Sequence, residues 1–356
     1  MQAGAVCGNF AVLDRLRGVA ALLVLVDHAG CVLLGRDLVP RNLLAVQFFF
    51  MLSGFVVACG YDARMRAGMG AGDFILRRVI RLYPLILLGA ALGACTLLAT
   101  DPFFATAPTP LLTVLLAVFC IPSPEAGFGF GHFPVNPPEW SLFFEIAANL
   151  AFATVLPRLS RQALIGVAIG ASLLYAALTI VYWPGSMPFW CEGIGAVGTF
   201  GIGIVLWRLH ARGMAFRWTP SWPALSASLV GVCISPMSLG PLMSPLTNLV
   251  LFPAIILVGA THGRRQTGSG WLGALSYPLY ILHWPVLLLA RAWLMPVIGP
   301  TLTIPVACVV AGLIAWSALH LFDLPVRAWL SRVLLQPRMP QSIDQPSRAG
   351  IAAQGV

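Results

Sequence analysis

Two ionisable side chains stand inside an apolar segment near the start of the chain, where charge is costly. Arg17 opens this segment and His28 follows eleven residues later, so in a helix both lie on one face, about 16 Å apart along the axis. A histidine exchanges protons near neutral pH and suits a general base acting on a hydroxyl, whereas an arginine suits a phosphate or carboxylate. Asp14, one turn before Arg17, is placed to orient its guanidinium. The pattern predicts a polar cavity within a membrane in which something is bound, moved or reacted.

Three arginines at the start of a later apolar run form a second candidate site. Arg78 and Arg81 are one helical turn apart on one face, and Arg77 is one turn from Arg81. Such a fork suits a polyanion, because guanidinium groups bind phosphate oxygens in pairs. The alternative is that these arginines only anchor a helix end at the cytoplasmic side of a membrane, which would suffice for an isolated pair.

A third group follows two consecutive prolines, Pro137 and Pro138, which predict the start of a helix. Ser141 and Glu145 are four residues apart, so we expect the serine hydroxyl to reach the carboxylate. Trp140 is expected in the outer interfacial belt of a membrane. Glu145 enters the membrane from the outer side with apolar sequence after it, which an interfacial role does not explain.

Weaker signals come from three other segments. Ser53 belongs to the run 48–55, whose small residues favour close helix packing. Tyr277, Tyr280 and His283 fall on one side of a proline-containing helix and are candidates to line the same cavity. Glu192 could line it too, although nothing else in the sequence supports that placement. The pair Asp323 and Arg327 is interpreted as a local ion pair that ends the last span.

The elements that position these residues are predicted to be transmembrane helices. The chain has 356 residues, 59% hydrophobic and 9% charged, with a mean hydropathy of +0.88, whereas soluble domains carry about 25% charged residues. We therefore expect an all-α, polytopic membrane protein. The net charge of +9 comes from arginines in short clusters between apolar runs, which indicates membrane topology and no nucleic-acid partner. The eight cysteines contain no C-x-x-C pair and predict no metal site.

Ten apolar runs are long enough to cross the hydrocarbon core, which needs about 17–25 residues. They are 12–34, 43–61, 82–100, 140–157, 162–182, 189–207, 222–240, 246–262, 271–293 and 299–322. The short run 111–121 is predicted not to cross, because then 18 of the 21 arginines face the cytoplasm. Segment 110–138 is accordingly external or re-entrant, and both termini are cytoplasmic. Residues 10–330 form one membrane domain, and 333–356 are expected to be a disordered cytoplasmic tail.

Several short motifs occur in a characteristic order between residues 10 and 327. They are Asp14-x-x-Arg17-Gly18 with His28, the run 49–55, Arg78-x-x-Arg81-x-x-Pro84, Trp140-Ser141-Leu142-x-x-x-Glu145 and Ser276-Tyr277-x-x-Tyr280-x-x-His283. In this order and spacing the chain resembles acyltransferase family 3, integral-membrane O-acyltransferases that modify surface polysaccharides, lipopolysaccharide, nodulation signals and macrolides. Asp27 beside His28, and Asp323 where a glutamate is more usual, depart from the family pattern.

The resemblance implies an acyl-CoA co-substrate, usually acetyl-CoA, bound from the cytoplasm, with no permanently bound cofactor. Arg17, Arg78 and Arg81 match the family's arginine positions and are expected to bind acyl-CoA. His28 matches its essential histidine and is expected to act as general base or to relay the acyl group. Glu145 matches an acidic residue expected to orient the acceptor or His28. The supporting residues are Asp14, Ser53, Trp140, Ser141, Tyr277, Tyr280 and His283, of which Ser53, Tyr277 and Tyr280 are candidate donors to the acyl oxygen.

We therefore expect an enzyme of the bacterial inner membrane that moves an acetyl or other acyl group to a hydroxyl of a surface glycan. A macrolide-type metabolite is the alternative acceptor. A transporter of a glycan or lipid-linked intermediate, which consumes no acyl-CoA, is the alternative function. A membrane scaffold without chemistry would leave the aligned Arg17 and His28 unexplained.

Overall fold

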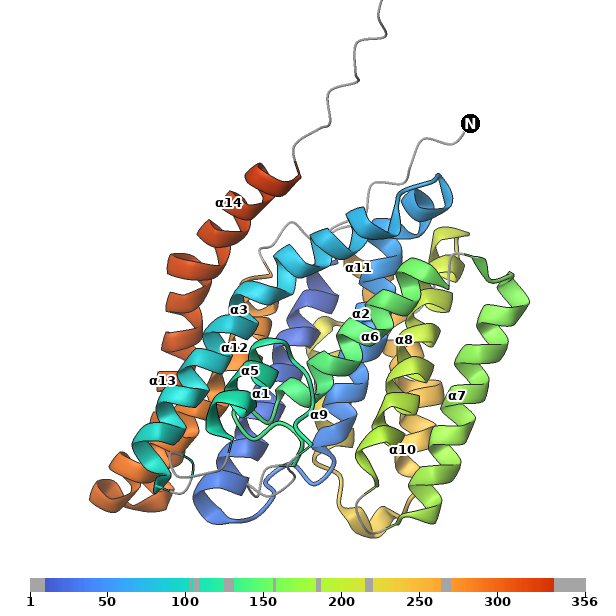
Figure 1. Cartoon of the computed structure of the whole chain (residues 1–356). Coiled ribbons are helices and arrows are strands. Elements are labelled where there is room, and N and C mark those ends of the chain that lie inside the picture. Colours follow the sequence, from blue (N-terminus) through green and yellow to red (C-terminus); the bar gives the residue numbers. More distant parts are fainter. Residues whose placement is uncertain are drawn as a thin grey trace, which may run out of the picture.

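The predicted apolar runs fold as helices, because backbone polar groups in lipid must be satisfied within the chain. The computed structural model describes residues 10–102, 104, 109–124, 131–155, 158–183, 187–214, 220–263 and 270–335, and these residues contain no strand (Figure 1). The predicted all-α class is confirmed. Most of the predicted disordered tail, 336–356, lies outside the described residues.

The helices in the first half of the chain are α1 (Ala11–Leu34), α2 (Asn42–Arg66), α3 (Ala71–Thr100), α5 (Pro110–Val118), α6 (Glu139–Thr154), α7 (Arg161–Val181) and α8 (Phe189–Ala211). Those in the second half are α9 (Trp222–Cys233), η2 (Met237–Leu239), α10 (Met243–Leu246), η3 (Thr247–Leu251), α11 (Phe252–Gly263), α12 (Trp271–Leu289), η4 (Ala290–Leu294), α13 (Met295–Ala318), η5 (Leu319–Asp323) and α14 (Leu324–Leu334).

Each of the ten predicted runs corresponds to a helical segment. Within the described residues, seven helices are long and apolar enough to cross a membrane, and the last of them is the continuous run Trp271–Leu334 of 64 residues. Gly299, with a φ of 75°, introduces a kink in that run. Helix α5 has only 9 residues and is about 14 Å long, too short to cross the hydrocarbon core, as predicted for the run 111–121.

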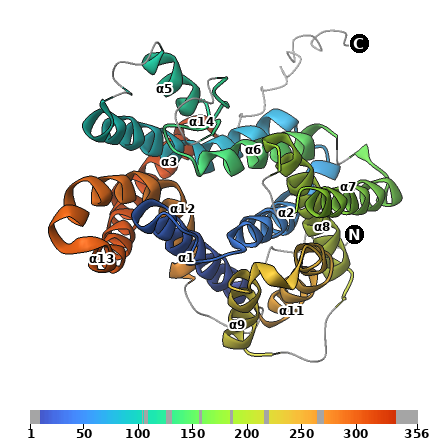
Figure 2. The same ribbon diagram turned by 90° about the horizontal axis from the view of Figure 1, so that it is seen from below.

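The long helices are arranged around α1 and α2. Seen from below, α3 and α6 lie on one side of this pair, α12 and α13 on a second, α7 and α8 on a third, and α9 and α11 on a fourth (Figure 2). Helices α2, α8 and α14 end at one face of the bundle, where α3 and α12 begin (Figure 1). We call this the arginine face, since its helix ends carry Arg66, Arg77, Arg161 and Arg212. By the positive-inside rule it is the predicted cytoplasmic face.

Glycines let two helix pairs approach closely at the centre of the bundle. A Cβ at Gly54 of α2 would clash with the backbone of Phe200 of α8, and one at Gly203 would clash with the carbonyl of Met51. In the same way, a Cβ at Gly273 of α12 would clash with Asp14 of α1. This second approach brings the following residues of α1 against α12.

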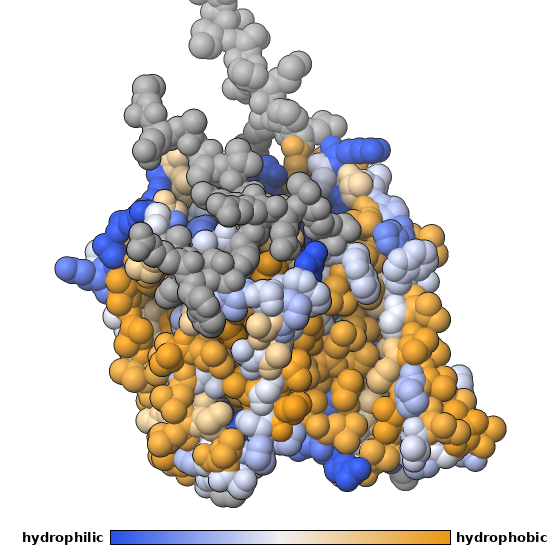
Figure 3. Space-filling view, turned by 180° about the vertical axis from the view of Figure 1, so that it is seen from behind, coloured by the Kyte–Doolittle hydropathy of each residue, from blue (hydrophilic) through white to orange (hydrophobic). Residues whose placement is uncertain are grey.

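The outer surface of the bundle is apolar at mid-height. In Figure 3 an orange belt covers the middle of the visible face, with hydrophilic residues toward its upper and lower rims. Many large apolar side chains are exposed on the protein surface, for example those of Val181, Val297 and Leu321. An apolar surface of this extent marks contact with lipid.

Candidate functional site

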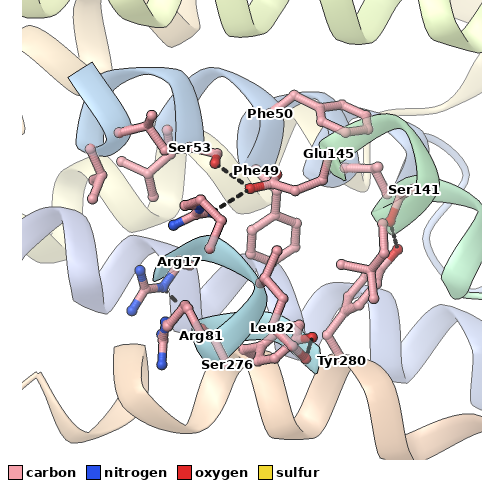
Figure 4. Close-up of a pocket in the computed structure, with 17 residues that line it drawn as sticks. Arg17, Phe49, Phe50, Ser53, Arg81, Leu82, Ser141, Glu145, Ser276 and Tyr280 are labelled. Atoms are coloured by element: carbon pink, nitrogen blue, oxygen red, sulfur yellow. Dashed lines mark hydrogen bonds and ion pairs between the residues drawn. The ribbon is translucent and has the colours of Figure 1, made fainter. Parts of the chain in front are cut away.

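A cavity of about 170 Å³ lies between α1, α2, α3, α6 and α12; we call it the inner cavity (Figure 4). Its polar lining residues are Arg17, Ser53, Arg78, Arg81, Ser141, Glu145, Ser276, Tyr277 and Tyr280, and its apolar ones include Phe49, Phe50, Leu52 and Leu82. Eight of the predicted site residues, from five separate helices, thus meet at one place, together with Ser276 of the same motifs.

Arg17 is held by α12. Its Nε donates to Ser276 Oγ at 3.0 Å, and its Nη2 donates to the carbonyl of Gly273 at 2.7 Å. Asp14 accepts from the same Nη2 at 3.2 Å, as predicted from the spacing. The close approach of α1 and α12 at Gly273 makes this geometry possible. Two hydrogen bonds and one ion pair thus fix the guanidinium group in the cavity wall.

Glu145 is the hydrogen-bonding centre of the opposite wall. Its Oε1 accepts from Arg78 Nη2 at 3.0 Å and from Ser53 Oγ at 2.6 Å, and the amide of Asn149 contacts it at 3.3 Å. The predicted contact with Ser141 is wrong: that hydroxyl lies 2.7 Å from Tyr280 Oη and donates to the carbonyl of Pro138. The Pro138 carbonyl, three residues earlier, accepts from both the backbone N–H and the hydroxyl of Ser141, at 3.4 and 3.2 Å, so this hydroxyl is bonded away from the carboxylate.

Arg81 has no hydrogen-bond or ion-pair partner among the described residues, although it lines the inner cavity. It also lines, with Arg78, a second cavity of about 420 Å³ at the arginine face, which we call the vestibule. Arg77 and Arg327 complete a wall of four arginines there. Arg78 and Arg327 already pair with carboxylates, Arg327 with Asp323 at 2.9 Å. The two cavities therefore meet at an unpaired cation.

His28 and His283 form a stacked pair, with His28 Nδ1 and His283 Nε2 2.7 Å apart. His283 Nδ1 lies 3.0 Å from the carbonyl of Leu279, which can only accept, so this nitrogen carries the proton. In a neutral pair His283 Nε2 then accepts from His28 Nδ1. The lone pair of His28 is left on Nε2, which makes no hydrogen bond within the described part of the chain.

The histidine pair lies beyond the end of the inner cavity. His28 is six residues from the end of α1, on the side away from the arginine face. Neither histidine belongs to the cavity lining. Tyr280 connects the two regions, because its ring lies 6.1 Å from that of His283 while its side chain lines the cavity. Arg17 and His28 share a helix but do not face the same space in this conformation.

The remaining predicted residues have clear structural partners. Tyr277 Oη donates to the carbonyl of Leu82 at 2.7 Å, and Trp140 packs against the ring of Phe144 outside the lining. Asp27 is buried and accepts from the backbone N–H groups of Leu38 and Val39 at 3.1 and 2.8 Å. Asp27 therefore fixes the connection from α1 to α2.

Ser276 and Arg327 were not among the predicted site residues. Ser276 belongs to one of the recognised motifs, but its role as hydrogen-bond acceptor for Arg17 becomes visible only when α1 packs against α12. Arg327 was interpreted only as an ion-pair partner of Asp323; that pair exists, and the arginine also lines the vestibule. Glu192, a further candidate for the inner cavity, does not line it. This residue lines another cavity.

Comparison with known proteins identifies the family of the chain. A family model described as an acyltransferase domain, that of acyltransferase family 3, matches residues 10–320. "Protein 2 in picA locus" of Rhizobium radiobacter is 32% identical over 184 residues, covering 48% of this chain and 94% of that protein. "Putative membrane-bound transacylase BcsY" of Komagataeibacter xylinus is 25% identical over 305 residues, covering 78% of this chain and 73% of that protein. No solved structure matches the chain. The chain belongs to acyltransferase family 3 and is a multi-pass membrane acyltransferase.

Proposed function

We propose that this acyltransferase takes an acyl group, most simply acetyl, from acyl-CoA at the arginine face and transfers it to a hydroxyl of a surface glycan. The arginine face is then cytoplasmic, in the inner membrane of a bacterium. The name of the Komagataeibacter relative, a transacylase bound to a membrane, supports the type of reaction. A macrolide-type acceptor is the alternative at the same site.

The observation that carries the proposal is the pair of cavities that share Arg78 and Arg81. Acyl-CoA has phosphates at one end and a thioester at the end of a long, weakly polar arm. The vestibule offers four arginines for the phosphates, and the inner cavity offers a mostly apolar channel for the arm. Arg81, at the junction and without a counter-ion among the described residues, is suited to the phosphate nearest the arm.

His28 is the proposed general base. Its Nε2 takes the proton of the acceptor hydroxyl while the hydroxyl oxygen attacks the thioester carbonyl. The C–S bond then breaks, and the leaving thiolate takes the proton back from the imidazolium to give CoA thiol and the ester. His283 positions His28 and keeps its free lone pair on Nε2. The thioester must pass Tyr280 to reach this nitrogen, because Tyr280 lies between the cavity and the histidines.

Tyr280 is the proposed donor to the acyl oxygen, which becomes negative during transfer. Of the three candidates, Tyr277 gives its proton to the Leu82 carbonyl and Ser53 gives its proton to Glu145. Tyr280 shares its hydrogen bond with Ser141, and either hydroxyl can be the donor. When the Ser141 hydroxyl turns its single proton from the Pro138 carbonyl to Tyr280 Oη, the Tyr280 proton is left for a ligand.

The test is release of CoA thiol from acetyl-CoA by the purified protein in nanodiscs, with and without a glycan extract of the host. We expect acceptor-dependent thiol release that the His28→Ala variant loses while it still binds acetyl-CoA. Retained turnover in this variant would exclude His28 as the base. Movement of a glycan across the bilayer without thiol release would support the transporter instead.

A further inference from the structure

A third cavity, of about 290 Å³, opens near the face opposite the arginine face; we call it the outer cavity. It lies between the start of α2, the end of α7, the start of α8 and the segment α10–η3, which Figure 1 shows at the lower end of the bundle. Its polar and aromatic lining residues are Arg41, Gln47, Tyr175, Thr179, Trp183, Glu192, Ser244 and Asn248. Helix α2 separates it from the inner cavity, which Val46 and Phe49 line.

Asn248 is a buried amide without a partner in the outer cavity. Its side chain is 4% exposed, and neither Nδ2 nor Oδ1 makes a hydrogen bond to any described residue. It lies on the π-helical turn η3, a geometry that often occurs at functional sites. Leaving both a donor and an acceptor buried and unpaired is costly, so a ligand with hydroxyl groups would recover both bonds.

Glu192 is fixed by a directional chain of hydrogen bonds. Gln47 Nε2 donates to Tyr175 Oη at 3.2 Å, and Tyr175 Oη donates to Glu192 Oε2 at 2.9 Å. At the far end, Gln47 Oε1 lies 3.2 Å from the Thr199 hydroxyl, whose proton is shared with the Gly195 carbonyl at 2.8 Å. The second oxygen, Oε1, makes no hydrogen bond within the described segments. The carboxylate is therefore oriented and has an acceptor left for a ligand hydroxyl.

Arg41 and Glu192 are the two charged residues in the lining of the outer cavity, so this lining carries no net formal charge. Arg41 Nη2 donates to the carbonyls of Pro236 and Gly240 at 3.2 and 3.0 Å, and the guanidinium lies 5.4 Å from the centre of the Trp183 ring. The charge is thus used to hold the loop beside the cavity. An amide, a carboxylate and the second face of the Trp183 ring remain, a combination that suits a neutral ligand with many hydroxyls and one apolar face.

We propose that the outer cavity binds a neutral sugar ring of a glycan, with Asn248 and Glu192 on its hydroxyls and Trp183 against its apolar face. The inference rests on the proposed function, since it identifies this sugar as a unit of the acceptor. Because α2 lies between the two cavities, the bound sugar is not the acylated unit but a neighbouring one. The outer cavity thus holds the polymer while another unit reacts.

The direct test is sugar binding in the absence of acyl-CoA. The probe is a panel of neutral disaccharides of glucose, galactose, mannose and rhamnose, with glucuronic-acid disaccharides for comparison. Binding to the protein in nanodiscs, free of sugar-based detergent, is measured by saturation-transfer NMR. We expect the wild type to bind at least one neutral disaccharide and Asn248→Leu to bind it at least tenfold more weakly. Absence of neutral-sugar binding, equal binding by the variant or preference for the acidic sugars overturns the proposal.

A stability measurement separates a ligand role from a structural one. Since the Asn248 amide has no partner in the described structure, Asn248→Leu should melt no lower than the wild type without sugar. The control is Asn42→Leu, which removes an amide bonded to Asp27 and should melt lower. A lower melting temperature for Asn248→Leu would show that the amide is already hydrogen-bonded in the sugar-free protein. A water in the adjacent void of about 10 Å³ could make that bond, and the proposal would then be overturned. Sugar binding without thiol release would refute only the proposed function.

Discussion

His28 Nδ1 lies 2.7 Å from His283 Nε2, and His283 Nδ1 lies 3.0 Å from the Leu279 carbonyl. The backbone carbonyl of one helix thereby determines, through two imidazole rings, which nitrogen of His28 can accept a proton. In the proposed mechanism, His283 would therefore act on the reaction through His28, without contacting the reacting atoms.

This relationship predicts different effects of two substitutions at His283. His283→Leu removes the acceptor for His28 Nδ1 and should lower kcat about 100-fold, since a positioned base contributes about 10²–10⁴-fold. His283→Gln keeps an acceptor near the Nε2 position and should recover at least tenfold of the loss. Thiol release and acetyl-CoA binding are measured in parallel, and the Kd for acetyl-CoA should not change. Wild-type kcat in His283→Leu would contradict the positioning role.

Arg81, which has no partner among the described residues, predicts a loss of affinity that depends on the phosphates of the donor. Arg81→Gln should weaken acetyl-CoA binding about 10- to 100-fold, because one charge-assisted hydrogen bond contributes about 1.5–3 kcal/mol. Acetyl-pantetheine, which lacks the nucleotide and its phosphates, should bind the variant and the wild type equally. Both affinities are measured by calorimetry at one ionic strength.

Arg332→Gln is the matched control for this loss. Arg332 is exposed on α14 and lines neither the vestibule nor the inner cavity. Its variant should bind acetyl-CoA like the wild type, which excludes a general effect of net charge. An equal loss in Arg81→Gln and Arg332→Gln would argue against a phosphate contact at Arg81.

The two cavity tyrosines should respond differently to loss of the hydroxyl. Tyr280→Phe should lower kcat about 100-fold or more with an unchanged Kd for acetyl-CoA, as removal of one oxyanion donor does. Tyr277→Phe removes a hydrogen bond to the Leu82 carbonyl, so its main effect should be a lower melting temperature. Steady-state thiol release and thermal unfolding of both variants check the contrast. Identical kinetics in both would assign the donor role elsewhere.

Two glycines of α2 predict opposite effects on stability. Gly54→Ala forces a Cβ onto the Phe200 backbone and should destabilise the protein by about 1–3 kcal/mol, as overpacking does. Gly60→Ala meets nothing within 4 Å and should be neutral or stabilising by up to about 1 kcal/mol. Thermal unfolding by intrinsic fluorescence measures both. Equal midpoints would mean that α2 and α8 can separate without cost.

Hydropathy predicted the helices because lipid forces every spanning segment to satisfy its own backbone. It predicted their ends less well. Helix α3 begins at Ala71, well before the predicted residue 82, because its first turns carry polar residues and arginines at the membrane surface. Helix α9 ends at Cys233 and not at 240, since Pro236 and Gly240 interrupt the run.

The sequence predicted those cavity residues whose charge inside an apolar run is unusual without reference to any partner, as for Arg17 and Glu145. The pairing of His28 with His283 could not, because the two are 255 residues apart and meet only where α1 packs on α12. That packing depends on Gly18 and Gly273, whose importance no periodicity reveals. The same holds for Arg81: that no described residue supplies its counter-ion is a property of the assembled helices.

The wall of four arginines in the vestibule has a consequence for regulation of the proposed reaction. These arginines would grip the phosphates, which acyl transfer leaves unchanged, so free CoA should bind nearly as tightly as its acyl ester. Product would then compete with donor for the empty protein. The rate of transfer would follow the ratio of acyl-CoA to free CoA in the cytoplasm, and modification of the acceptor would report the acylation state of the cell's CoA pool.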